Sequence, residues 1–232
     1  MGSAGASSMN PDSDAGTGTL QGQVLLLTDD SFVSARLYNS GATVTADGAS
    51  GSPVSGNWNG ADPFMLDGVT RAATNWVSVK PDLIGGDPLL TYQAVRTNQV
   101  TKSDLALVSA ATLDAIFTSV SMLRSANSGQ VVLFFRSAGT GVPLSGLRVT
   151  MASAQAAIYS GATRWVSDDG TAITDQSGLI VFANVDPPNS GGTQVVTVTR
   201  AATTTTPAAA AGEFAVKVVP GAATIATIGV QL

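Results

Sequence analysis

Cysteine and histidine are both absent from this chain of 232 residues. Without cysteine there can be no disulfide, no thiol nucleophile and no thiolate metal ligand. Without histidine the chain also lacks the commonest general base and the commonest metal-ligating side chain. These two absences exclude the usual nucleophile–histidine catalytic arrangements, and they favour a protein with no catalytic residues and no cofactor.

Charge is scarce as well, at 12% of residues, and the net charge is −5. The eleven Lys and Arg residues are scattered. No basic cluster can neutralise phosphates, so neither nucleic acid nor an anionic membrane surface is expected as a partner. No run of 18 apolar residues occurs, so no membrane span is expected either.

Few motifs for nucleophilic catalysis are left. No Gly-x-Ser-x-Gly sequence occurs, and the segment Ser121 to Arg124 lacks the lysine of a Ser-x-x-Lys site. No glycine-rich loop carries the lysine that would cradle a phosphate. A hydrolase built on paired aspartates stays open as a third hypothesis, because such pairs converge only in space.

What the chain does contain is one strand-and-turn pattern that occurs twice. Each copy begins Gly-Gln-Val, continues with Ser-Gly-x-x-Val-Thr, and then has an apolar run ending in valine and an alternating strand. The matching segments are 22–24 and 129–131, 40–45 and 145–150, 64–69 and 180–185, and 76–79 and 195–198. The order is kept while the loop lengths differ, which indicates two copies of one small β-domain.

Short alternating strands separated by Gly, Pro and Asp turns predict an all-β fold. The run Val131 to Phe135 is apolar throughout and is expected to be a central strand. Residues 47–62 hold four glycines and a proline, and predict a long irregular loop. The low-complexity tract 201–212 is expected to be an exposed hairpin tip or a disordered loop.

One stretch has a helical period instead. Leu113, Ile116, Phe117 and Val120 recur at the spacing of one helix face. With Thr112 as the N-cap, the pattern predicts an amphipathic helix from Leu113 to Leu123.

The small polar residues 1–19 predict a flexible linker. Such a linker ahead of a cysteine-free β-protein is typical of an exported protein whose leader has been removed. We therefore expect the periplasm, the outer membrane surface or the extracellular space. In one form of this hypothesis, the native protein has a cysteine in place of Met1, and a lipid is attached to that cysteine. The alternative is a cytosolic protein.

The second copy resembles the carboxypeptidase regulatory-like family, also called transthyretin-like or prealbumin-like. The resemblance covers residues 129–200. It rests on Gly141-Val142-Pro143-Leu144-Ser145-Gly146-Leu147-Arg148-Val149 and on Thr174-Asp175-Gln176-Ser177-Gly178-Leu179-Ile180-Val181-Phe182. In the first copy the second motif is replaced by Asn59-Gly60-Ala61-Asp62-Pro63. The resemblance implies a β-sandwich that serves adhesion, scaffolding or ligand binding, with no catalytic residue to transfer.

Together these observations predict two Ig-like or transthyretin-like β-sandwich domains joined by a short amphipathic helix. The expected limits are 1–19 for the linker, 20–98 for the first domain, 99–128 for the helical connector and 129–232 for the second domain.

Aspartates in the second copy are candidates for a metal site. Asp168, Asp169 and Asp175 could supply oxygens to Ca²⁺. Their spacing fits no EF-hand loop, so the competing interpretation is that they form turns.

Two tryptophans are candidates for contact with a ligand or partner. Trp58 lies between Asn57 and Asn59 in a glycine-rich setting, and Trp165 follows Arg164. An exposed aromatic ring beside amides suits stacking on a sugar or a protein. The alternative is that both rings fold onto the sheets.

The sequence thus favours a non-catalytic, exported or surface-associated bacterial structural or adhesion module. Its partner would be another envelope or surface protein, or a second copy through self-assembly. The second hypothesis is a carbohydrate-binding module that uses the two tryptophans.

Overall fold

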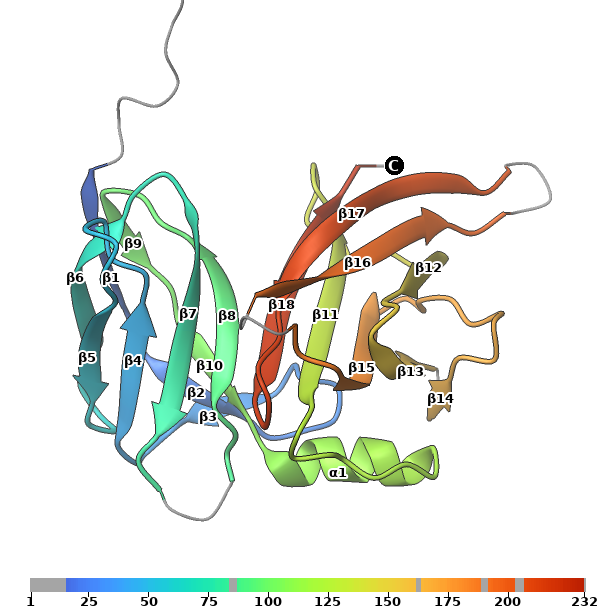
Figure 1. Cartoon of the computed structure of the whole chain (residues 1–232), viewed down its shortest axis with the longest axis horizontal. Coiled ribbons are helices and arrows are strands. Elements are labelled where there is room, and N and C mark those ends of the chain that lie inside the picture. Colours follow the sequence, from blue (N-terminus) through green and yellow to red (C-terminus); the bar gives the residue numbers. More distant parts are fainter. Residues whose placement is uncertain (1–15, 84–86, 162–163, 189–191, 203–206, 232) are drawn as a thin grey trace, which may run out of the picture.

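The computed structural model describes residues 16–83, 87–161, 164–188, 192–202 and 207–231. It is built almost wholly of β-strands with one helix, so the predicted all-β sandwich class is confirmed. Figure 1 shows two β units side by side, with the helix beneath the second. The first part of the chain forms β1 (Thr17–Gly22), β2 (Val24–Leu27), β3 (Ala35–Leu37), β4 (Ala42–Ala46), β5 (Val54–Trp58), β6 (Phe64–Thr70), β7 (Thr74–Pro81), β8 (Thr91–Arg96), β9 (Val100–Lys102) and β10 (Leu105–Val108).

The helix α1 (Ala110–Ser119) follows, and the rest of the chain is again β. It forms β11 (Gly129–Ser137), β12 (Leu147–Thr150), β13 (Ala154–Ser160), β14 (Trp165–Ser167), β15 (Leu179–Val185), β16 (Thr193–Arg200), β17 (Ala209–Lys217) and β18 (Ala223–Val230).

The repeat seen in the sequence is also present in the pairing of the strands. In the first unit β4 pairs antiparallel with β7 and places Val44 opposite Val79. In the second unit β12 pairs antiparallel with β16 and places Val149 opposite Val198. Likewise β1 pairs antiparallel with β6 and parallel with β9, as β11 does with β15 and β18. The segments that match in sequence therefore form strands with the same pairing partners in the two units.

The Gly-Gln-Val segments are the exception. Gly22 ends β1, whereas Gly129 begins β11, so the two glycines pair with different points of their partner strands. In the first unit the strand is interrupted after Gly22, and the backbone N–H of Gln23 donates to Asp104 Oδ1 at 2.9 Å instead of to a neighbouring strand. Beyond that break the chain resumes as β2, which pairs parallel with β10.

Each unit encloses a core between its sheets. In the second unit, Leu147 and Val149 face Ile180 and Phe182 across the sandwich, as their alternation predicts. Both faces of β15 are covered, and all seven of its residues are buried. The apolar run Val131 to Phe135 lies in β11 between β15 and β18, so the prediction of a central strand is confirmed.

In three segments the described structure differs from the pattern predicted from the sequence. The helix begins at Ala110 with Ser109 as its N-cap, not at Leu113 with Thr112, and it ends at Ser119. The expected loop 47–62 contains β5, which pairs with β4. Residues 17–19 of the expected linker belong to β1, while residues 1–15 lie outside the described part.

The domain limits stay a prediction. The predicted connector 99–128 holds β9 and β10 as well as α1. In the tract 201–212, residues 203–206 lie outside the described part, and β17 already begins at Ala209.

Candidate functional site

Backbone pairing, a shared apolar cluster and polar contacts connect the two β units, and we call this region the joint. The backbone pairing involves one strand from each unit. Strand β8 of the first unit pairs parallel with β18 of the second, with Thr91, Tyr92 and Gln93 opposite Ala223, Thr224 and Ile225. One nine-stranded sheet therefore runs through both units, in the order β14-β13-β15-β11-β18-β8-β7-β4-β5. A sheet that crosses from one unit to the other restricts their relative rotation.

Two side chains of β8 also bind the backbone of β10, which lies next to β8 in the first unit. The Thr91 hydroxyl accepts a hydrogen bond from the Val108 N–H at 3.2 Å and donates to the Leu89 carbonyl at 2.9 Å. The Gln93 Oε1 atom accepts from the Ala106 N–H at 2.7 Å. Buried N–H groups need such partners, so β10 stays fixed next to the strand that carries the crossing.

An apolar cluster fills the space below the crossing. It contains Leu27 and Phe32 of the first unit, residues on the outer face of the second unit's sheet, and Leu113, Ile116 and Phe117 of α1. All three helix residues are buried. Because the cluster draws on both units and on the helix, it behaves as one core and not as a contact between two surfaces.

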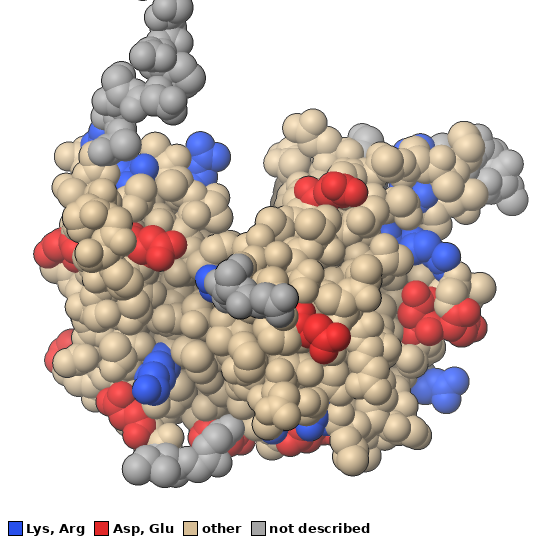
Figure 2. All heavy atoms as spheres, viewed as in Figure 1, with Lys and Arg blue, Asp and Glu red and all other residues tan. Residues whose placement is uncertain are grey.

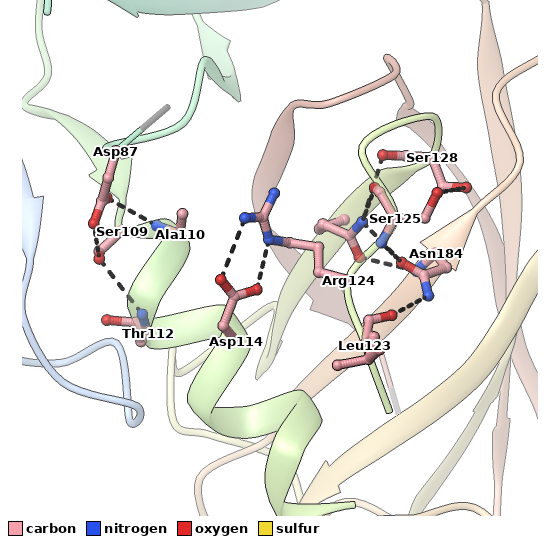
Figure 3. Close-up of polar contacts among 11 residues, drawn as sticks. Asp87, Ser109, Ala110, Thr112, Asp114, Leu123, Arg124, Ser125, Ser128 and Asn184 are labelled. Carbon is pink, nitrogen blue, oxygen red and sulfur yellow. Dashed lines mark hydrogen bonds and ion pairs between the residues drawn. The ribbon is translucent and has the colours of Figure 1, made fainter. Parts of the chain in front are cut away.

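Polar contacts fix the start of the helix in this cluster (Figure 3). Asp87 Oδ1 accepts from the Ala110 N–H at 2.9 Å, and Asp87 Oδ2 accepts from the Ser109 hydroxyl at 3.1 Å. The Ser109 Oγ atom in turn accepts from the Thr112 N–H at 3.4 Å. A carboxylate at the N-terminus of a helix satisfies free N–H groups and opposes the helix dipole.

Beyond the helix, the connector is held to the second unit by Asn184 (Figure 3). Asn184 Oδ1 accepts from the Ser125 N–H at 2.8 Å and from Gln130 Nε2 at 3.2 Å, while Nδ2 donates to the Leu123 carbonyl at 2.9 Å and to Gln155 Oε1 at 2.7 Å. Nearby, Arg124 forms a two-point ion pair with Asp114 of the helix, at 2.8 and 3.3 Å.

Asn184 occupies a β-bulge in which β15 carries one extra residue opposite β11. Its φ of 49° lies in the left-handed region, which asparagine tolerates better than most residues. The bulge turns the amide toward the connector, where only 7% of the residue remains exposed. The sequence offered one signal of this role, a polar residue within an otherwise apolar strand.

Trp165 also connects the two units. It is 8% exposed, and its indole Nε1 donates to Asp30 Oδ2 of the first unit at 3.2 Å. Its ring meets that of Phe32 edge to face, with centroids 6.5 Å apart. Its neighbour Arg164 is exposed. Of the two interpretations of Trp165, the structure agrees with the ring folded onto the sheets and contradicts the exposed stacking ring, because a loop of the first unit covers it.

Trp58 is also buried, in the core of the first unit. It ends β5, only 1% of it is exposed, and its Nε1 donates to the Tyr38 carbonyl at 2.8 Å. The flanking amides Asn57 and Asn59 are exposed. Asn59 Oδ1 accepts from two backbone N–H groups of the following turn, at 2.9 Å each. The alternating strand points the ring inward and the amides outward, so here too the structure agrees with the ring folded onto the sheets and contradicts the exposed ring.

Replacing Trp58 by phenylalanine is expected to lower the free energy of unfolding by about 1 kcal/mol. The hydrogen bond to Tyr38 is lost while most of the apolar contact is kept. Denaturant titration of the variant measures this. Asn57→Ala, one residue away and exposed, is the control and should stay within about 0.5 kcal/mol of the parent. Equal effects of the two changes would contradict the buried role of Trp58.

The candidate calcium ligands form turns. Asp168 accepts from the N–H groups of Gly170 and Ala172, at 2.8 and 3.1 Å. Asp169 accepts from the Thr171 hydroxyl and N–H, which lower the pKa of its carboxyl. Asp175 Oδ1 accepts hydrogen bonds from the N–H and the hydroxyl of Ser177. In the described part of the chain no three metal-ligating side chains gather at one point.

A groove lies between the units on the side away from the helix. Figure 2 shows the surface hollowed there. The groove encloses about 470 Å³, and its walls are Thr74, Trp76 and Ala94 of the first unit, Glu213 to Val216 of β17, and Ala226 to Gly229 of β18. Trp76 is partly buried and packs against the core of the second unit.

The sequence matches no protein-family model, and a search of curated proteins finds no relative. Among solved structures, the chain is similar to the shaft pilin SpaA from Lactobacillus rhamnosus GG, at 10% identity over 93% of this chain and 97% of that chain, with a TM-score of 0.26. It is also similar to BcpA, the major pilin subunit of Bacillus cereus (11% identity, 93% and 69% coverage, TM-score 0.27), and to the group B streptococcus pilus 2b backbone protein (11%, 94% and 86%, 0.24).

At these TM-scores the likeness carries no argument about fold or function. The resemblance of residues 129–200 to the carboxypeptidase regulatory-like family is likewise not confirmed. The β-sandwich class rests on the chain's own strands. The described part contains no helix long and apolar enough to cross a membrane.

Proposed function

We propose that this chain is a non-catalytic, exported and surface-associated bacterial structural or adhesion module that binds another protein, or a second copy, through strand edges or loops. The observation that carries the proposal is the joint, in which backbone pairing, a shared apolar cluster and a polar hub all connect the two β units.

A structural role explains why the joint is built in this way. Domains that are merely tethered meet through polar surfaces and move relative to each other. Here the two units share a sheet and a buried cluster, so binding or tension at one unit is transmitted to the other with little change of geometry. A module that holds partners at a fixed spacing needs this property, whereas a flexible linker would abolish it.

The carbohydrate-binding hypothesis loses its structural basis, because both candidate tryptophans are buried. No observation favours a hydrolase based on aspartates. The aspartates whose bonds are described above have structural partners: turn backbone for Asp168, Asp169 and Asp175, the helix start for Asp87, and Gln23, Trp165 and Arg124 for Asp104, Asp30 and Asp114.

Fractionation of the source cells tests the proposal. We expect the protein in the envelope fraction or the medium, where mild cross-linking and co-purification should recover a protein partner or a second copy. Mass spectrometry of the native N-terminus decides whether a lipid is attached. Recovery only from the cytosol, with neither a partner nor a second copy attached, would contradict the proposed function.

A further inference from the structure

The groove between the units begins where the strand pairing of the joint ends. Among the described residues, β18 pairs with β8 only from Ala223 to Ile225, although both strands continue beyond that point. Residues 226–229 of β18 and Ala94 of β8 then lie on the walls of the groove, where the two units diverge (Figures 1 and 2). The continuous sheet therefore divides here into two strands that no longer pair with each other.

The backbone of β18 faces the groove at two residues. The Ala223 N–H donates to the Leu90 carbonyl at 2.9 Å and so faces the first unit, whereas the Val230 carbonyl accepts at 3.0 Å from the residue that follows β11. Because backbone groups alternate in direction along a strand, Thr227 and Gly229 face the first unit, as Ala223 does. Both are exposed, and no described strand pairs with them on that side. They offer two N–H and two carbonyl groups to an added strand.

The side chains of the walls are largely apolar. Trp76 and Ala94 lie opposite each other on neighbouring strands, so they share one face of the first unit's sheet. Phe214 and Ile228 contribute the wall on the side of the second unit. Glu213 is exposed and is the only charged residue among the described residues that line the groove. The walls are therefore complementary to apolar side chains accompanied by one basic side chain.

The free backbone groups favour an extended polypeptide as the occupant. A strand added to a sheet edge gains affinity from main-chain hydrogen bonds and specificity from its alternate side chains. A compact apolar ligand would exclude water from the four backbone groups of β18 without pairing them, which costs free energy. The groove volume of about 470 Å³ lies within the range of ligand sites in proteins, about 300–1,000 Å³.

We propose that this groove binds an extended segment of a partner protein, which adds a strand to β18 at Thr227 and Gly229 and places a basic side chain beside Glu213. This inference rests on the proposed function, since it specifies the surface through which a protein partner is bound. The shared sheet and the apolar cluster of the joint hold the two walls in place. The site is therefore formed before the segment binds, which lowers the cost of binding.

Random heptapeptides displayed on phage provide the probe. We expect the peptides selected by the parent protein to alternate apolar residues with polar ones and to contain lysine or arginine. Ala94→Trp fills the groove from its first-unit wall, so it should weaken binding of the selected peptides by about tenfold or more. Asn57→Trp is the matched control, because Asn57 is exposed on β5 and lies outside the groove. It should leave the dissociation constant within about twofold of the parent value.

Two further measurements report how the peptide binds. Glu213→Lys replaces attraction of the basic side chain by repulsion, so we expect the dissociation constant to rise by about three- to tenfold. Hydrogen exchange at the N–H groups of Thr227 and Gly229 should slow in the complex, because a hydrogen-bonded N–H is protected. Circular dichroism and thermal unfolding show first that each variant is folded.

Weaker binding to Ala94→Trp and Glu213→Lys but not to Asn57→Trp, together with slower exchange on β18, supports the proposal. A library that yields no binding peptide overturns it. Binding that either groove variant leaves unchanged overturns it too, and so does unchanged exchange at Thr227 and Gly229. Any of these failures leaves the proposed function intact if the envelope fraction still yields a protein partner. Groove binding by a protein recovered only from the cytosol overturns the proposed export alone.

Discussion

Replacing Phe117 by alanine should lower the free energy of unfolding by about 3–5 kcal/mol, among the largest effects expected of a single core truncation in this chain. Phe117 is fully buried in the helix, in the cluster that joins both β units. Its removal leaves a cavity between α1 and the outer face of the nine-stranded sheet. The surrounding side chains come from three parts of the chain, so they cannot collapse into the space without moving the helix.

The same variant tests whether the two units unfold as one. In the parent, unfolding followed by tryptophan fluorescence and by far-UV circular dichroism should give one transition, because the units share a core and a sheet. In Phe117→Ala we expect the two probes to separate. Leu123→Ala is the matched control, since that side chain lies just beyond the helix and is 84% exposed. A loss below about 1 kcal/mol in Phe117→Ala would show that the cluster does not hold the units together.

The second large effect is expected at Asn184. Changing it to alanine removes four side-chain hydrogen bonds. The buried Gln130 amide and the part-buried Ser125 N–H, Leu123 carbonyl and Gln155 amide then lose this partner. Each buried group left unsatisfied costs about 1–3 kcal/mol, with part recovered by water, so we expect a net loss of about 2–4 kcal/mol. Alanine also tolerates the φ of 49° poorly.

Two measurements separate these contributions. Asn184→Gly loses the same hydrogen bonds but accepts the left-handed backbone, so it should be more stable than Asn184→Ala by about 1 kcal/mol. Hydrogen exchange at the Ser125 N–H should accelerate in both variants, because its acceptor is gone. If the free energy of unfolding of Asn184→Ala lies within about 0.5 kcal/mol of the parent value and exchange at Ser125 is unchanged, Asn184 does not stabilise the connector.

Local patterns in the sequence predicted the inward faces of several strands and the repeat of the two units. Alternation in Leu147 to Val149 and in Ile180 to Phe182 gave the correct inward faces, because side chains on a strand alternate with a period of two in any sheet. The matched valines of the two copies lie in matched registers for the same reason. The amphipathic spacing correctly identified Leu113, Ile116 and Phe117 as the buried face of the helix.

The start of the helix was not decided locally. Ser109 and Thr112 are both acceptable N-caps, and the sequence alone favoured Thr112. Asp87, more than twenty residues away, selects Ser109 by bonding its hydroxyl and the N–H of Ala110. A distant carboxylate of this kind leaves no trace in the spacing of the helix itself.

The sequence left the exposure of the two tryptophans open for a related reason. Glycines and asparagines around Trp58 indicated a loop, yet pairing of β5 with β4 turned the segment into an edge strand with the ring inward. Trp165 is covered by Phe32 and Asp30, which lie in the other unit. Exposure of an aromatic ring depends on what packs over it, and in both cases the covering residues are remote in the chain.

The sequence by itself determined that this is an all-β protein of two repeated units with one helix and no cysteine or histidine chemistry, because those properties follow from composition and from periods of a few residues. The tertiary structure alone decided that the two units share a sheet through β8 and β18, that Asn184 anchors the connector, and that a loop of the first unit covers Trp165. Each of these depends on which distant strands lie side by side. That choice is made by the packing of whole cores and by the pairing of buried backbone groups, which no local pattern encodes.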